Sequence, residues 1–170
     1  GVTDSLGTVT SSTFGTDTLQ NIDRIFGGSG DDVFTRGTLH QGNFGSFVEF
    51  EGLGGNDTFN GVSGQSMRVG YSRSTSAVTV DLSAGTALDG FGGTDTIANA
   101  SQVRGSAFDD VLTGSAGAGF SFERFRGQAG DDIIDGGTGE DQADYLNSPT
   151  GVSVNLSTGL ALDGFGGTDT

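Results

Sequence analysis

The chain has 170 residues, of which 33 are Gly and 1 is Pro, and its formal net charge at pH 7 is −15. Its charged residues are 18 Asp, 4 Glu and 7 Arg with no Lys, so the chain should repel nucleic acid and anionic membranes and attract cations. It has no Cys and no run near the ~18 apolar residues of a membrane span, which excludes disulfide bonds and argues against membrane insertion.

The predicted elements are short strands that follow Gly-rich turns ending in Asp. In chain order, a turn ends at Asp17, and blocks of nine residues follow at 27–35, 52–60, 90–98, 105–113, 127–135 and 136–144. A last turn ends at Asp169. Each block has six turn residues and then x-apolar-x, which places one inward side chain on a very short strand. No window has a sustained helical period, so the sequence predicts an all-β chain.

A longer repeat contains these blocks. The segment Ala87–Thr96 recurs unchanged as Ala161–Thr170, a spacing of 74, and Tyr71 corresponds to Tyr145. An earlier copy precedes them at a spacing of 78 and carries about four additional residues. The sequence therefore predicts one continuous solenoid over 1–170, with long units of roughly 1–77, 78–151 and a truncated 152–170.

Composition points to metal as a source of stability. Leu, Ile, Val and Phe make up about 24% of the chain, just above the range in which chains stay disordered. Since disulfides are absent, bound metal is the expected compensation for a small core. The excess of Asp over Glu places the acidic residues in turns, because Asp suits turns and Glu suits helices.

The nine-residue blocks resemble the RTX, or haemolysin-type, calcium-binding nonapeptide G-G-x-G-x-D-x-U-x, most clearly at 127–135 and 136–144. The resemblance implies an all-β parallel β-roll, a β-helix-like solenoid stabilised by Ca²⁺. Each nonapeptide is then half of one coil, which gives a coil length of about 18 residues. The long spacing of 74 corresponds to about four such coils.

The resemblance and the coil length together predict several Ca²⁺ ions along two columns of turns. Strands stacked about 4.8 Å apart bring Asp side chains and loop carbonyls together, and Ca²⁺ takes six to eight oxygen ligands. The first column contains the turns that end at Asp17, Asp32, Asp57, Asp95, Asp110, Asp132 and Asp169. The second, weaker column contains Glu123 and Asp141. The glycines predicted to line the sites are Gly28, Gly30, Gly55, Gly93, Gly130, Gly137 and Gly139.

Some features of the blocks predict differences between turns. Leu53 occupies the second position of its block and Phe108 the fourth position of its block, and the motif has Gly at both positions. We therefore expect less complete calcium sites at these two turns. Asp131, at the fifth position of its block, is expected to face outward. The short step from Asp95 to Asp110 predicts a tight coil that turns near Asn99 and returns to the same side.

The sequence predicts that the chain is not an enzyme. His40 is the single His, so a zinc site or a nucleophile–histidine pair has no support. The adjacent Asp131 and Asp132 point in different directions on a strand end and offer no two-sided slot for glycosidase chemistry.

Three functions remain open at this stage. The first is a structural module of a large secreted or cell-surface protein of adhesin, surface-layer or matrix type, whose partners are neighbouring repeats or a surface ligand. The second is a calcium-triggered secretion and folding module of an RTX enzyme or toxin. The third is ligand binding by the side loops 39–47 and 116–122. All three imply an extracellular location, where calcium is abundant enough to fill sites with a Kd of about 10⁻⁴–10⁻³ M.

Overall fold

The computed structural model describes residues 7–11, 15–19, 22–37, 47–116 and 122–170, and every regular element among them is a β-strand. The strands are β1 (Gly7–Ser11), β2 (Gly15–Leu19), β3 (Arg24–Phe26), β4 (Val33–Thr35), β5 (Val48–Glu51), β6 (Thr58–Asn60), β7 (Met67–Gly70), β8 (Thr79–Asp81), β9 (Thr86–Leu88), β10 (Thr94–Ala98), β11 (Gln102–Arg104), β12 (Val111–Thr113), β13 (Phe122–Arg126), β14 (Ile133–Asp135), β15 (Glu140–Ala143), β16 (Ser153–Asn155), β17 (Leu160–Leu162) and β18 (Thr168–Asp169). The all-β prediction is confirmed. In the described part of the chain, no helix is long and apolar enough to cross a membrane.

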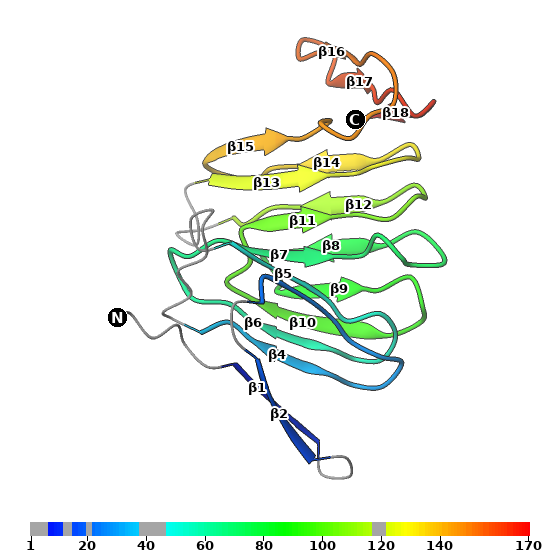
Figure 1. The fold of residues 1–170 in the computed structure, drawn as a ribbon. Coiled ribbons are helices and arrows are strands. Elements are labelled where there is room, and N and C mark those ends of the chain that lie inside the picture. The colour runs from blue at the N-terminus through cyan, green and yellow to red at the C-terminus, as the bar shows by residue number, and fades with distance from the viewer. Residues whose placement is uncertain (1–6, 12–14, 20–21, 38–46, 117–121) are drawn as a thin grey trace.

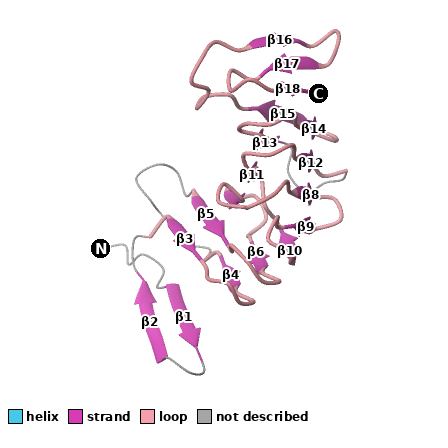
Figure 2. Cartoon of the chain, turned by 90° about the vertical axis from the view of Figure 1, so that its right-hand side faces the viewer, coloured by secondary structure: helices cyan, strands magenta, loops and turns pink. Residues whose placement is uncertain are grey.

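Two sheets of mostly parallel strands form the body of the fold. One has six strands in the order β15-β13-β11-β7-β5-β3, and each neighbouring pair is parallel. The other has seven strands in the order β14-β12-β8-β9-β10-β6-β4. The chain passes between the sheets at successive turns, for example from β3 to β4 and from β13 to β14, so the strands stack along the molecule (Figures 1 and 2). This is the predicted parallel β-roll.

The length of one coil varies along the roll. Phe125 pairs with Ala143, and this step of 18 matches the predicted coil. Val103 pairs with Phe125 at a step of 22, and Ile25 pairs with Phe50 at a step of 25. The additional residues fall in the connections from β12 to β13 and from β4 to β5. The predicted length holds where two nonapeptides follow each other directly.

One segment of the seven-stranded sheet reverses direction, which the sequence did not predict. β9 pairs antiparallel with both β8 and β10, while β10 pairs with β6 and β8 pairs with β12 in parallel. The tight turn between β8 and β9 contains Gly85 at φ +70°, and the Ala84 N–H donates to Asp81 Oδ1 at 2.8 Å. This local turn closes a hairpin before the chain can complete another parallel coil. β16, β17 and β18 repeat the antiparallel arrangement.

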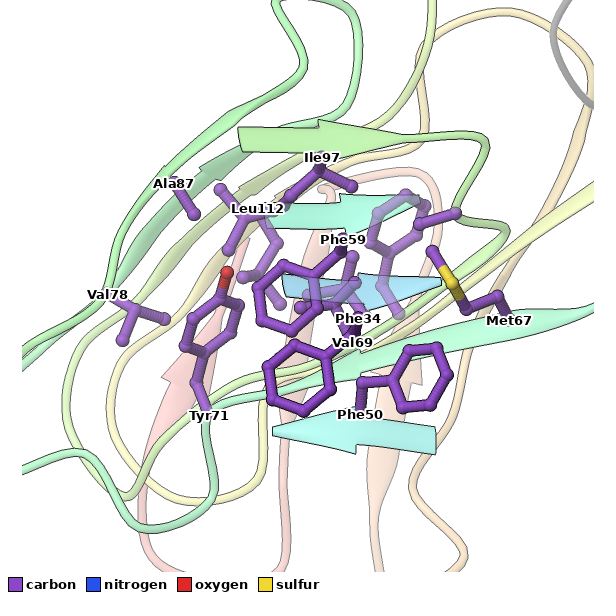
Figure 3. Close-up of a cluster of buried hydrophobic side chains, with 14 of the residues drawn as sticks. Phe34, Phe50, Phe59, Met67, Val69, Tyr71, Val78, Ala87, Ile97 and Leu112 are labelled. Atoms are coloured by element: carbon purple, nitrogen blue, oxygen red, sulfur yellow. The ribbon is translucent and has the colours of Figure 1, made fainter. Parts of the chain in front are cut away.

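The core lies between the two sheets and uses the central apolar residue of the short strands. The rings of Phe34, Phe50 and Phe59 stack with centroids 5.2 to 5.3 Å apart. Phe59 and Leu112 are 0% exposed, and Figure 3 shows the buried side chains gathered between the strands. Burying each such side chain contributes about 1.5–3 kcal/mol relative to leaving it exposed. The inward positions of the nonapeptide pattern are thus confirmed at these residues.

A network of arginines covers the outer face of the six-stranded sheet. Glu49 in β5 is 0% exposed. Its carboxylate forms ion pairs with Arg24 and Arg104 at 2.9 Å and with Arg68 at 3.4 Å. Without these partners a buried carboxylate would strongly destabilise the fold. Glu49 is therefore a structural carboxylate of the sheet, separate from the acidic turns.

An apolar hollow of about 230 Å³ lies beside the sheet of β16 to β18, with Ile134, Val154 and Leu160 among its lining residues. Val80, which corresponds to Val154 in the long repeat, is 0% exposed because β8 pairs with β12. Val154 is 49% exposed, since β16 pairs only with β17 among the described strands. The hollow is therefore core surface that no further strand among the described residues covers, and Asn155 and Asp169 also line it.

Candidate metal sites at the turns

The Asp residues that end the Gly-rich turns form a hydrogen-bonded ladder along one edge of the seven-stranded sheet. In each step the backbone N–H of one Asp donates to Oδ1 of the corresponding Asp on the neighbouring strand, at 2.8 to 3.2 Å. The ladder has two runs, Asp32, Asp57 and Asp95 and then Asp110, Asp132 and Asp169. All of them except Asp32 are at most 2% exposed. Six of the seven turns predicted for the first column therefore lie on this edge.

The ladder is interrupted at the antiparallel hairpin. Asp95 and Asp110 are not neighbours, because β9 and β8 lie between their strands, so the predicted tight coil between them is wrong as a stacking step. Asn99 has the positive φ of a turn, 54°. At Asp110 the N–H of Val78, and not that of another ladder Asp, donates to Oδ1, at 2.8 Å.

The placement of Asp17 in the column is also wrong. Its strand β2 finds its hydrogen-bond partners locally, in an antiparallel pair with β1 that forms a separate sheet.

The second oxygen of the ladder carboxylates distinguishes two kinds of turn. In the first kind, Oδ2 accepts the N–H of the second turn residue. Gly28 donates to Asp32 at 2.8 Å, and Ser106 donates to Asp110 at 2.6 Å. In these turns the Asp side chain caps the backbone of its own turn.

In the second kind of turn, Oδ2 has no partner. The second residue has a left-handed backbone, with φ of 75° at Leu53 and 90° at Gln128. Oδ2 of Asp57 and of Asp132 is buried with no hydrogen bond. A buried carboxylate oxygen without a partner is destabilising, so it marks a place where a cation fits. The turn forms even though Leu53 departs from the motif, because Leu53 adopts a conformation usual for glycine.

Backbone carbonyl oxygens of neighbouring turns reach the same spaces. A Cβ on Gly105 would collide with Oδ2 of Asp110 and would lie 2.8 Å from the carbonyl oxygen of Gly127. The carboxylate and carbonyl oxygens of successive turns thus share a space that only glycine leaves open. This is the oxygen arrangement that stacked nonapeptides predict.

The second column is shorter. The Glu123 N–H donates to Asp141 Oδ1 at 3.1 Å, and Glu123 Oε2 accepts the Ser115 N–H at 2.8 Å. Glu123 is 1% exposed while Asp141 is exposed. The predicted pairing of these two acids is confirmed.

The glycines predicted to line the sites lie in these turns. Four have left-handed backbone with φ between 78° and 135°, namely Gly55, Gly130, Gly137 and Gly139. The carbonyl oxygen of Gly30 lies 2.6 Å from the point that a Cβ on Gly55 would occupy. Gly93 donates its N–H to Asp89 Oδ1 at 2.8 Å.

Asp131 is exposed, as predicted, but it is also hydrogen-bonded. Its N–H donates to Asp109 Oδ1 and its own Oδ1 accepts the Thr168 N–H, at 2.8 and 2.7 Å. A second, exposed ladder thus runs beside the buried one. His40 and most of the two predicted side loops lie outside the described residues.

Burial raises the pKa of five carboxylates of the ladder. Desolvation raises the pKa of Asp57 and of Asp95 to about 6 and that of Asp132 to about 7, and neighbouring carboxylates add to the effect. Desolvation also raises the pKa of Asp110 and Asp169. A cation among these groups would favour their charged forms, because it replaces lost hydration and offsets the repulsion between like charges.

The donor set fits Ca²⁺. Among the residues that the structure describes, no three Asp, Glu, His or Cys side chains come together as a ready-made metal group. An ion at this edge would therefore use backbone carbonyl oxygens together with one or two carboxylates. Ca²⁺ accepts this mixture of oxygen ligands readily, whereas structural Zn²⁺ sites rely on Cys and His.

Sequence reasoning missed two acidic residues at this edge. Asp89 and Asp163 are both 0% exposed, and each stands directly before the recurring G-F-G-G-T-D turn. The unchanged recurrence of Asp at that position could have identified them. The nonapeptide motif specifies an Asp at its sixth position only, and these two residues stand before its first position.

A comparison with protein families decides the nature of the repeats. The model described as RTX calcium-binding nonapeptide repeat (4 copies) matches residues 19–38, 98–118 and 121–144. The chain carries RTX calcium-binding repeats. A search of curated proteins finds no match. The RTX repeats are calcium-binding structural units. Outside the matched residues, Asp57 and Asp95 continue the run that begins at the matched Asp32, and Asp169 continues the run of the matched Asp110 and Asp132.

Proposed function

We propose that this chain is a calcium-stiffened structural segment of a large secreted or cell-surface protein of adhesin, surface-layer or matrix type. The observation that carries the proposal is the buried Asp ladder, in which Oδ2 of Asp57 and Oδ2 of Asp132 have no hydrogen-bond partner in the protein. Ca²⁺ at these positions would convert a destabilising row of carboxylates into cross-links between successive coils.

The proposed ligands are the ladder carboxylates and the carbonyl oxygens of the adjoining turns. In the first column these are the six ladder residues Asp32, Asp57, Asp95, Asp110, Asp132 and Asp169, and in the second column Glu123 and Asp141. Extracellular sites of this type bind Ca²⁺ with a Kd of about 10⁻⁴–10⁻³ M, which suits a protein that folds after export. The predicted role of Asp17 as a ligand is not part of this proposal, because its strand lies in another sheet.

Repetition of the long unit favours a rod over a module attached to an enzyme or toxin. The hydroxyl of Ser74 donates to the Asp89 carbonyl at 2.6 Å, and Ser148 donates to the Asp163 carbonyl at 2.5 Å. The corresponding residues of the two hairpins thus make the same hydrogen bond. We propose tandem units of this length with neighbouring repeats as the main partners and with no catalytic role.

Small-angle X-ray scattering with and without Ca²⁺ tests the proposal. The chain in Ca²⁺ should scatter as an elongated rigid particle, and removal of Ca²⁺ should give the profile of an expanded chain. A compact profile that does not respond to Ca²⁺ would contradict the role of a calcium-stiffened rod. Hydrolase activity that survives purification of this chain would contradict the non-catalytic assignment.

A further inference from the structure

Only one of the two carboxylate oxygens accepts hydrogen bonds in Asp89 and in Asp163. Oδ1 of Asp89 accepts three backbone N–H groups, from Phe91, Gly92 and Gly93, at 2.8 to 2.9 Å. Oδ1 of Asp163 accepts the N–H groups of the three corresponding residues at 2.8 to 2.9 Å. These bonds fully explain one oxygen of each carboxylate as the cap of the following turn.

The other oxygen has no such explanation. Oδ2 of Asp89 and Oδ2 of Asp163 are buried and have no hydrogen-bond partner, although both residues are 0% exposed. A carboxylate that served only as a cap would be better placed with its second oxygen in water. The same unpartnered oxygen occurs at the corresponding position of both hairpins, so it is a regular feature of the long repeat.

A carbonyl oxygen of a neighbouring turn lies near each unpartnered oxygen, with a glycine beside both. A Cβ on Gly93 would collide with the Gly55 carbonyl oxygen and would lie 2.8 Å from Asp89 Oδ2. Gly55 belongs to the turn that ends at Asp57, whose own Oδ2 is also buried without a partner. The carboxylate of Asp89 is close enough to contribute to the raised pKa of both Asp57 and Asp95.

The second copy has the same arrangement. A Cβ on Gly167 would collide with the Gly130 carbonyl oxygen and would lie 3.1 Å from Asp163 Oδ2. Gly130 belongs to the turn that ends at Asp132, and Oδ2 of Asp132 again lacks a partner. At each joint between a hairpin and a nonapeptide turn, a turn carbonyl oxygen therefore lies near an unpartnered carboxylate oxygen, and the same turn ends in a second carboxylate with an unpartnered oxygen.

We infer that Asp89 and Asp163 are calcium ligands, each holding one Ca²⁺ through Oδ2 together with the carbonyl oxygen of Gly55 or Gly130 and the carboxylate of Asp57 or Asp132. This inference rests on the proposed function and adds a ligand outside the sixth position of the nonapeptide. It assigns the antiparallel hairpin a role, because the ion would fasten β8–β10 or β16–β18 to the parallel coil beneath. Both Asp residues lie outside the segments matched by the RTX model.

Asn substitutions separate capping from calcium binding. In Asp89→Asn with Asp163→Asn, each amide oxygen can still accept the three N–H groups of the turn, but Oδ2 and its charge are lost. The matched control is Asp81→Asn with Asp135→Asn. Those residues each accept one turn N–H through Oδ1, and neither has a buried unpartnered oxygen.

Calorimetric titration of Ca²⁺ into the whole chain provides the main test. We expect the Asp89→Asn/Asp163→Asn variant to bind two fewer ions than the wild type and the control variant to bind the full number. Equal stoichiometry and affinity in the two variants would overturn the inference while leaving the proposed function intact. If the wild type itself bound no Ca²⁺, the proposed function would fail as well, so the two failures are distinct.

A single variant and a second measurement cover the case in which the double variant does not fold. Asp163 follows β17 of the last, three-stranded sheet, so in Asp163→Asn the rest of the roll should stay folded and one ion should be lost. Tb³⁺ can replace Ca²⁺ as the probe, because it also prefers oxygen ligands and its emission is sensitised by nearby tyrosine. The chain has two Tyr and no Trp, and the Tyr71 hydroxyl donates to Asp95 Oδ2 at 3.0 Å, beside one proposed site. Sensitised emission should fall in Asp89→Asn, and emission equal to that of Asp81→Asn would count against the site.

Discussion

The backbone N–H of Asp110 donates to Oδ1 of Asp132 at 2.9 Å, so one hydrogen bond joins these two residues of adjacent coils. Oδ2 of Asp132 is left buried and unpartnered. We predict that Asp132→Asn keeps the ladder hydrogen bond, because its amide oxygen still accepts, but loses one calcium ion and lowers thermal stability in Ca²⁺.

Asp131→Asn is the matched control for that variant. Asp131 is exposed and its Oδ1 accepts the Thr168 N–H, a bond that an Asn oxygen can keep. Calcium titration and thermal unfolding of both variants compare a buried with an exposed carboxylate in the same turn. An equal loss of ions in the two variants, or a loss only in Asp131→Asn, would mean that the fifth position of the turn supplies the ligand.

Tyr71 links the six-stranded sheet to the ladder. The fully buried Tyr71 hydroxyl donates to Asp95 Oδ2 at 3.0 Å, and burial together with that carboxylate raises the pKa of Tyr71. Tyr71→Phe leaves Asp95 without this donor and should lower the free energy of unfolding by about 1.5–3 kcal/mol, the usual range for a hydrogen bond to a charged group. Urea unfolding in saturating Ca²⁺ measures the change. Wild-type stability in Tyr71→Phe would show that a bound ion or water takes over the role of the hydroxyl.

The phenylalanine stack sets the stability of the N-terminal coils. Phe59 is 0% exposed and packs between the strands against Phe34 at 5.2 Å. Phe59→Ala should lower the free energy of unfolding by about 3–5 kcal/mol, because it leaves a cavity in a tightly packed core. Val33→Ala, at a side chain that is 72% exposed, should change it little. Similar losses in the two variants would contradict the inward assignment of the central strand residue.

The raised pKa values predict an unusual pH dependence for the metal-free chain. The folded-state pKa is about 6 for Asp57 and Asp95 and about 7 for Asp132, while an unfolded Asp titrates near its ordinary value of about 3.9. Between these values the folded state binds more protons, so stability should fall as the pH rises from about 4 to about 7. Thermal unfolding in calcium-free buffer across this range measures the trend. A midpoint that rises with pH would show that the carboxylates are already paired without metal.

Calcium should reverse this trend. Because Ca²⁺ competes with protons for the same carboxylates, its affinity should increase over the same pH window. Titrations at several pH values check the direction, and an affinity that does not depend on pH would place the ions away from the ladder.

The nonapeptide blocks allowed the roll and its Asp edge to be predicted because each block couples a turn of fixed length to one inward residue. Asp110 and Asp132 therefore lie together as expected. The same reasoning failed at Asp17 and at the step from Asp95 to Asp110, where hydrogen bonds within a local hairpin replace the next parallel coil. Periodicity does not distinguish these outcomes, because either pairing satisfies the backbone of a short strand.

The unpartnered oxygens could not be predicted from sequence. Whether Oδ2 of an Asp meets an N–H depends on the backbone of the second turn residue, which is left-handed at Leu53 and Gln128 but not at Ser106. These three residue types give no indication of that difference. Only the three-dimensional arrangement shows that Asp57 and Asp132 retain a free oxygen while Asp110 does not.

Far-UV circular dichroism of the whole chain at neutral pH, in chelator and in saturating Ca²⁺, tests the central claim most directly. The account predicts a largely disordered spectrum in chelator and a β-rich spectrum in Ca²⁺, with no such change in Mg²⁺, which retains its water ligands and demands a stricter geometry. The same β-rich spectrum in chelator and in Ca²⁺ would contradict it, because the roll would then fold without metal at its turns.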